Sequence, residues 1–194
     1  MSCIAICGDS ASGKTVMANL LAVLLRDSVV LECDRYHLWE RNNPIWQKEF
    51  THLNPAANNI HLMNLDVYEL KKGTTIYRPN YDHRTGTFTD PVAINPADHI
   101  IVSGLHTFMC PESMYDLKIF MDPSDELKIQ WKINRDISNR GYTYEQVKEQ
   151  IERRKSDYET FVLPLRSRAD IVVNNFDDPS FNYVWQQVQK TLSV

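Results

Sequence analysis

The sequence predicts an α/β fold, a parallel sheet that carries helices on both of its faces. Short apolar runs alternate along the chain with stretches of helical periodicity, as in proteins built on a parallel sheet. The runs show little alternation of apolar and polar residues, as expected for strands buried on both sides. A glycine-rich loop joins the first run to the first helical stretch. The predicted strands span residues 3–7, 29–33, 99–103, 117–121 and 171–173.

Apolar residues at helical spacing predict the helices between these strands. The predicted ranges are 16–25, 58–71, 125–138, 143–161 and a closing helix with an inner stripe from Phe181 to Leu192. Thr143 and Gln146 have the spacing of a capping box. Residues 74–96 are rich in Pro, Thr, Asn and Gly, so we expect a small hairpin or ordered loop projecting from the sheet.

Composition and charge narrow the class of protein. The 194 residues are 43% hydrophobic and carry a net charge of −4, which does not favour nucleic acid or an anionic membrane as a partner. None of the four cysteines forms a C-x-x-C pair, so neither a zinc site nor a disulfide framework is expected. The first strand begins at once and no apolar run reaches transmembrane length, so we expect a cytoplasmic protein.

The loop after the first strand fits the phosphate-binding pattern G-x-x-x-x-G-K-[ST]. Glycines let successive backbone N–H groups point at phosphate oxygens, and the start of the next helix adds positive potential. Lys14 would neutralise the outer phosphates, and the Thr15 hydroxyl would bind Mg²⁺. The expected nucleotide-binding residues are Gly8, Asp9, Ser10, Ala11, Ser12, Gly13, Lys14 and Thr15.

The second strand ends in a polar segment suited to a second substrate, because ligands of open α/β sheets bind beyond the carboxyl ends of the strands. Asp34 could accept a hydroxyl proton there, while His37 and Arg41 could bind an anionic group. Taken singly, an Asp that caps a turn beside solvated charges explains these residues equally well.

Further cations follow near residue 140. Arg135 and Arg140 bracket a loop, and Gly141 allows a hinge-like turn that would close the arginines over a transferring phosphoryl group. Arg153 and Arg154 lie on the next predicted helix, away from its apolar face, where surface ion pairs explain them slightly better.

The motifs form an ordered set from about residue 4 to about residue 173. Besides residues 8–15 it contains 34–37 with Arg41, 54–59 (NPAANN) with 62–63 (LM), 79–86 (PNYDHRTG), 104–106 (GLH), 131–133 (WKI) with 135–136 (RD), 140–141 (RG), and 153–154 (RR) with 157–158 (DY). In this order the set resembles the phosphoribulokinase/uridine kinase family, and phosphoribulokinase more than uridine kinase.

The resemblance implies a P-loop kinase that uses ATP and Mg²⁺ to phosphorylate a sugar or sugar-phosphate hydroxyl, with an acceptor like ribulose 5-phosphate favoured. It implies a single domain over 1–194, with an acceptor loop at about 74–96 and a helical lid at about 133–154. Thr15 and Asp34 would hold the metal. The implied catalytic residues are Asp34, Lys14, Arg135, Asp136 and Arg140. The implied substrate-binding residues are His37, Arg41, Tyr81, His83, Lys132, Arg153 and Arg154.

One position departs from the family pattern. The strand at 99–103 should end in a glutamate, and Ser103 stands there instead. A serine hydroxyl can orient a metal-bound water, but it lacks the charge that helps a carboxylate to hold Mg²⁺. Three explanations remain. Asp34 or Asp136 contributes more to metal binding, or the enzyme is slow or uses another acceptor. In the third, the chain is a nucleotide-binding regulatory protein with weak or no kinase activity.

The acceptor class also stays open at this point. A sugar phosphate needs cations such as Arg41, whereas Trp39 and Tyr81 could stack the base of a nucleoside, so a uridine/cytidine kinase is the alternative. The expected partner is a small molecule. A homo-oligomer is left open, since phosphoribulokinases continue beyond the point where this chain stops.

Overall fold

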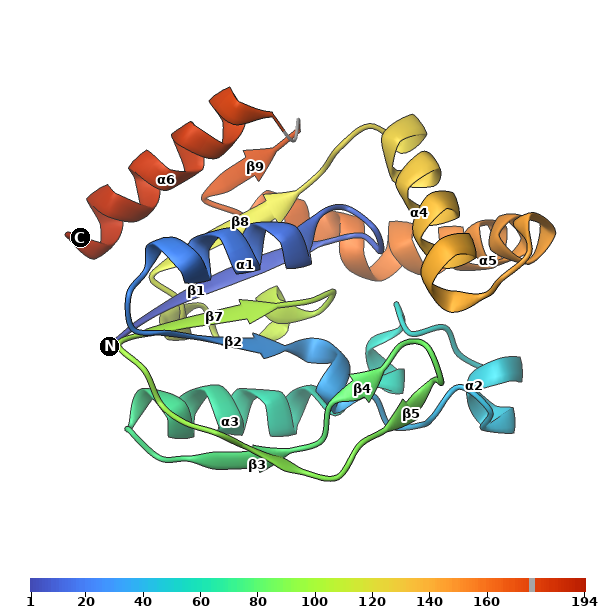
Figure 1. The fold of residues 1–194 in the computed structure, drawn as a ribbon, viewed down its shortest axis with the longest axis horizontal. Coiled ribbons are helices and arrows are strands. Elements are labelled where there is room, and N and C mark those ends of the chain that lie inside the picture. Colours follow the sequence, from blue (N-terminus) through green and yellow to red (C-terminus); the bar gives the residue numbers. More distant parts are fainter. Residues whose placement is uncertain (175–176) are drawn as a thin grey trace.

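A computed structural model describes residues 1–174 and 177–194. Its centre is a parallel sheet of five strands in the order β2-β7-β1-β8-β9 (Figure 1). The strands are β1 (Ser2–Gly8), β2 (Ser28–Glu32), β7 (His99–Ser103), β8 (Leu117–Met121) and β9 (Ile171–Val173). The predicted fold class is therefore confirmed, and every predicted strand is present within one residue of its predicted bounds.

Helices cover both faces of this sheet (Figure 1). α1 (Lys14–Leu24) and α6 (Asp178–Leu192) pack on one face, where Ile4 and Ile6 of β1 share an apolar cluster with Met17. α3 (Ile60–Lys71) packs on the other face, against the alternate β1 side chains. Alternate side chains of β1 thus belong to two separate apolar clusters, as expected for a strand that is covered on both faces. No helix within the described ranges is long and apolar enough to span a membrane.

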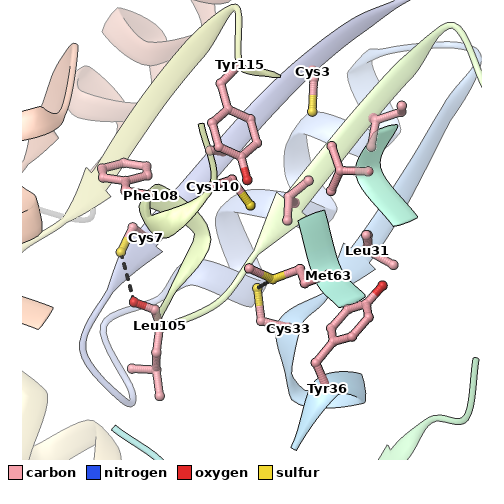
Figure 2. Packing of buried hydrophobic residues seen from close by; sticks show 14 of the residues in the cluster. Cys3, Cys7, Leu31, Cys33, Tyr36, Met63, Leu105, Phe108, Cys110 and Tyr115 are labelled. Carbon is pink, nitrogen blue, oxygen red and sulfur yellow. Dashed lines mark hydrogen bonds between the residues drawn. The ribbon is translucent and has the colours of Figure 1, made fainter. Parts of the chain in front are cut away.

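All four cysteines are free and buried. Figure 2 shows them in the apolar cluster that also contains Met63 of α3. The Cys7 thiol donates to the Leu105 carbonyl oxygen at 3.2 Å, and the Cys33 thiol lies 3.2 Å from the sulfur of Met63. Burial raises the pKa of Cys7 to about 11, so this thiol stays protonated and serves the packing.

Two helices project beyond the carboxyl end of the sheet (Figure 1). α4 (Asp125–Arg140) ends at Gly141, whose φ of 71° closes the helix in the left-handed region. α5 (Tyr144–Asp157) opens with the predicted capping box. The long helix predicted over 143–161 is shorter than expected, because the chain passes into a π-helical turn (Tyr158–Val162) and a 3-10 helix (Leu163–Arg168) that carries Pro164 in its first turn.

Residues 74–96 form nested antiparallel ladders, which confirms the predicted hairpin. β3 (Ile76–Arg78) pairs with β6 (Val92–Ile94), and β4 (Tyr81–Asp82) pairs with β5 (Thr87–Phe88). Arg78 anchors this hairpin to α3 by donating to both carboxylate oxygens of Asp66, at 2.6 and 2.7 Å. A short helix that the sequence analysis did not predict, α2 (Pro44–Lys48), lies between β2 and α3 in the chain.

Candidate active site

A cavity of about 670 Å³ is lined by the phosphate-binding loop, the ends of β2 and β7, the hairpin, and the α4–α5 pair. Six Lys and Arg side chains line it, against the two carboxylates of Glu32 and Asp34. A cavity with this excess of positive charge favours anionic ligands, because each cation offsets the desolvation of a phosphate oxygen.

The loop that follows β1 has the backbone of a phosphate cradle. Gly8 and Gly13 have φ angles of 147° and 91°, and a Cβ atom on Gly8 would lie 2.5 Å from the Met121 carbonyl oxygen. Residues 10–15 line the cavity, whereas Gly8 and Asp9 do not. The Lys14 ammonium donates to the Asp9 carbonyl oxygen at 2.6 Å. Burial lowers the pKa of Lys14, and the charges of Asp9 and Asp34 oppose that shift.

Asp34 lies just beyond the end of β2, between two histidines. Its Oδ2 is 2.9 Å from Nε2 of His83, and its Oδ1 is 3.4 Å from Nε2 of His37. Burial would raise the pKa of Asp34, but the hydrogen bonds from His37 and His83 outweigh it and hold the pKa well below its ordinary value. Asp34 is therefore an ionised hydrogen-bond acceptor at neutral pH.

The orientation of His37 is fixed from its other nitrogen. The Asn58 amide donates to the carbonyl oxygens of His52 and Asn54, at 3.1 and 2.9 Å. Its Oδ1 must therefore face Nδ1 of His37, 2.7 Å away, and Nδ1 must be the donor. With Nδ1 committed to Asn58, Nε2 faces Oδ1 of Asp34.

Arg41 holds the hairpin instead of standing free in the cavity. Its guanidinium donates to the carbonyl oxygens of His83 and Arg84, and its backbone N–H donates to Gly86 at 2.8 Å. Gly86 leaves room for this contact, since a Cβ atom there would lie 2.5 Å from Cβ of Arg41. Arg41 lines the cavity as predicted, but its two-pronged contact is made with the protein's own backbone.

Aromatic rings form one wall of the acceptor side. Tyr81 lies edge-on to His37, with ring centroids 4.9 Å apart, and Trp46 of α2 approaches His37 at the same distance. His52 stacks parallel to Trp46. Sequence reasoning identified Tyr81 but missed Trp46 and His52. The Asn43-Pro44 pair, a helix start signal, could have indicated the helix that positions Trp46.

The cations of α4 are organised by one buried carboxylate. Asp136 is fully buried and pairs with Lys132 at 2.6 Å, Arg135 at 2.8 Å and Arg140 at 3.3 Å. Burial would raise the pKa of Asp136, but the bonds from Arg135 and Lys132 bring it to about 2. Burial, with the nearby Arg154 charge, lowers the pKa of Lys132 to about 8.

The resemblance placed all four residues in the active site, but only two of them line the cavity. Arg135 and Arg140 line the cavity, whereas Lys132 and Asp136 lie behind its wall. Lys132 is 5% exposed and its ammonium faces Asp136, so a direct contact of Lys132 with substrate does not fit this structure. The Asp136 carboxylate instead holds Lys132, Arg135 and Arg140 together near the end of α4.

Arg153 and Arg154 both reach the cavity, although a helix surface was the favoured explanation from sequence. Arg153 donates to the carbonyl oxygens of Trp46 and Phe50, both at 3.1 Å, and so joins α5 to the acceptor side. Burial lowers the pKa of Arg154 to about 10, and its Nη1 is buried without a hydrogen-bond partner.

Two unsatisfied polar atoms indicate what the cavity is built to hold. Nη1 of Arg154 and the hydroxyl of Ser12, in the phosphate-binding loop, are buried and have no protein partner within the described ranges. Buried polar groups of this kind are normally satisfied by a ligand or water. With the Thr15 hydroxyl and the carboxylates of Asp34 and Glu32 lining the same cavity, the donor set fits a triphosphate with Mg²⁺.

Comparison with known proteins agrees with this geometry. The model of the phosphoribulokinase/uridine kinase family matches residues 3–181. The phosphoribulokinase of Synechocystis sp. is 34% identical over 174 residues, which cover 88% of this chain and 52% of that protein. The uridine kinase of Borrelia hermsii is 30% identical over 179 residues, covering 88% of this chain and 84% of that protein. This chain spans about half the length of the phosphoribulokinases it matches.

Solved structures share the fold. The phosphoribulokinase from Rhodobacter spheroides superposes with a TM-score of 0.69 at 24% identity, covering 92% of this chain and 73% of that one. The D-glycerate 3-kinase from Cryptococcus neoformans gives a TM-score of 0.60 at 16% identity, covering 82% and 78%. By its matched family model, and as its ordered motifs predict, the chain belongs to the phosphoribulokinase/uridine kinase family.

Proposed function

We propose that this protein is an ATP- and Mg²⁺-dependent kinase that transfers the γ-phosphoryl group to a hydroxyl of a sugar phosphate similar to ribulose 5-phosphate. One observation carries the proposal. The Asp34 carboxylate, oriented by two histidines, lines the same cavity as the phosphate-binding loop and the arginines of α4 and α5. A carboxylate placed across from a phosphate site suits an acceptor hydroxyl.

Each element of the site has a distinct task in this proposal. The amides of residues 10–15 and the Lys14 ammonium bind the triphosphate. Thr15 and Asp34 hold the Mg²⁺ ion, which when bound neutralises charge on the phosphates. Asp34 accepts the hydroxyl proton from the acceptor. Arg135 and Arg140, on a lid at about 133–154, cover the phosphates and exclude water.

The charge of the acceptor side supports a phosphorylated substrate. Arg153 and Arg154 reach the cavity from α5, and His37 and His83 flank Asp34. Arg154 has a free buried donor that a substrate phosphate would satisfy. The aromatic wall around Trp46 favours a second candidate, a uridine or cytidine kinase, because a nucleobase stacks on such rings.

An ADP-release assay tests the proposal directly. The purified chain is given Mg-ATP with ribulose 5-phosphate, ribose 5-phosphate, uridine or cytidine. We expect ribulose 5-phosphate to stimulate ADP release most, and Asp34→Asn to abolish that stimulation. Asp90→Asn is the matched control, since Asp90 is an exposed carboxylate of the hairpin outside the cavity. ATP binding without stimulation by any acceptor would refute the kinase and favour a nucleotide-binding regulatory protein.

A further inference from the structure

Glu32 and Ser103 are partners across two neighbouring strands. Glu32 ends β2, Ser103 ends β7, and the parallel register pairs their Cα atoms. Side chains at paired positions of a parallel ladder lie on the same face, about 4.8 Å apart. Two residues earlier the pair Val30 and Ile101 packs in the apolar cluster of α1. Glu32 and Ser103 therefore both face the α1 side of the sheet.

This face leads to the phosphate-binding loop. α1 begins at Lys14, and Thr15, Glu32 and Ser103 all line the one cavity. Glu32 thus stands one strand away from the position where the family pattern has a metal-binding glutamate and this chain has Ser103. Positions 32 and 103 lie on the same face of the sheet, at the same level along their strands, and both line the same cavity.

Among the carboxylates of Glu32, Asp34 and Asp136, that of Glu32 is the one left available for a ligand. Both carboxylate oxygens of Asp34 face histidines, at 2.9 and 3.4 Å. Asp136 is fully buried behind the cavity among Lys132 and two arginines. Glu32 is exposed, and no hydrogen bond or ion pair occupies its carboxylate within residues 1–174 and 177–194. Mg²⁺ in kinase sites takes one or two carboxylates besides phosphate oxygens and water.

We propose that Glu32 supplies from β2 the carboxylate that Ser103 no longer supplies from β7, and that it helps Thr15 to hold the Mg²⁺ of the bound nucleotide. The assignment rests on the proposed function, because it requires that the cavity binds Mg-ATP. It also assigns different tasks to the two cavity carboxylates. Glu32 takes over the metal contact that the proposed function gives to Asp34, and Asp34 keeps its histidines and serves the acceptor hydroxyl.

Calorimetry tests this assignment without turnover. ATP affinity is measured in EDTA and in Mg²⁺, and the ratio of the two dissociation constants reports how strongly metal and nucleotide assist each other. In Glu32→Gln we expect ATP affinity in EDTA to be kept and the ratio to fall by about tenfold. Glu149→Gln is the matched control, since Glu149 is exposed on α5 and does not line the cavity. Electron paramagnetic resonance of Mn²⁺ gives a second measure of the same loss.

Returning the carboxylate to β7 separates a metal ligand from a merely structural residue. We expect Ser103→Glu to restore the ratio in the Glu32→Gln background, because the two positions face one site. An unchanged ratio in Glu32→Gln, or a folded double variant that binds ATP without restored Mg²⁺ dependence, would overturn the assignment while leaving the kinase proposal intact. Failure of the wild type to bind ATP would overturn both.

Discussion

The Nε2 atom of His83 lies 2.9 Å from Oδ2 of Asp34 and thereby connects the hairpin to the end of β2. His83 comes from the middle of the 74–96 insertion, 49 residues along the chain from Asp34. The hydrogen bond helps to hold the pKa of Asp34 low, so it couples the position of the hairpin to the ionisation of the proposed base.

The first prediction concerns this pair. His83→Ala removes one of the two hydrogen bonds that lower the pKa of Asp34, so that pKa rises. Because Asp34 must be ionised to act, the acid limb of the kcat/KM profile should move to higher pH by about one unit, equivalent to about 1.4 kcal/mol. His61→Ala, on the exposed side of α3, is the control. An acid limb that stays at its wild-type pH would show that His83 does not tune Asp34.

A second prediction concerns the contact between Gly86 and Arg41. Gly86→Ala places a Cβ atom 2.5 Å from Arg41 Cβ and should break the attachment of the hairpin to Arg41. Gly73→Ala is a matched control, because Gly73 has a similar positive φ, 83° against 78°, but no atom within 4 Å of the added carbon. Urea unfolding should show a loss of about 1 kcal/mol in the control and about 1–3 kcal/mol more in Gly86→Ala.

The difference between these two variants isolates the contact from the backbone strain. We also expect acceptor KM to rise in Gly86→Ala alone, since the hairpin carries Tyr81 and His83 into the cavity. Equal losses of stability in both variants would mean that Arg41 moves away from the added carbon without a further loss of folding free energy.

A third prediction concerns Asp136. Asp136→Asn leaves Lys132 buried beside Arg135 and Arg140 without a counter-charge, and breaking a buried pair in this way costs about 3–5 kcal/mol. Urea unfolding should report that loss. Asp125→Asn is the control, because Asp125 pairs with Lys128 at 2.7 Å but its side chain is 80% exposed, where an ion pair contributes about 0–1 kcal/mol. Similar losses in the two variants would contradict the role of Asp136 as the organiser of α4.

A fourth prediction is acid sensitivity of the fold from His106. Burial lowers the pKa of His106 to about 4, while its Nε2 hydrogen-bonds the Leu53 carbonyl oxygen at 2.9 Å. The unfolded chain, with an ordinary pKa of 6.5, takes up this proton first, so the free energy of unfolding falls as pH drops from 6.5 toward 4. The slope from this one group approaches about 1.4 kcal/mol per pH unit.

His106→Gln keeps a donor for Leu53 and removes the titration. Urea unfolding between pH 6.5 and 4.5 should therefore show a shallower slope for this variant. Burial also lowers the pKa of His52, which acts in the same direction, so the slope should lessen without vanishing. A variant as acid-sensitive as the wild type would show that His106 titrates normally in the folded protein.

Much of the fold could be predicted from sequence because its determinants are local. The apolar runs of 99–103 and 117–121 match β7 and β8 residue for residue, since a strand buried on both faces leaves little choice of residue. The helix after Thr143 was recognisable at its start but not at its end, because its capping box is local and its passage into a π-helical turn depends on tertiary packing.

The site was less predictable where it depends on partners distant in the chain. Asp34, the phosphate-binding loop and the two α4 arginines could be assigned from motifs. Two other features depend on contacts that the spacing of residues does not encode. Arg41 is held by the hairpin, and Lys132 faces Asp136 away from the cavity. Glu32 gave no signal in sequence, because only the register of β2 against β7 brings it opposite Ser103.

The same register has an evolutionary consequence. Positions 32 and 103 lie 71 residues apart in the chain. They are nevertheless neighbours in space, because they are paired on adjacent parallel strands. During evolution an acid can appear at position 32 before the acid at position 103 is lost. Every intermediate protein then keeps a carboxylate at this place. The proposed role of Glu32 therefore predicts that family members without the usual acid on β7 keep Mg²⁺-dependent ATP binding where an acid ends β2.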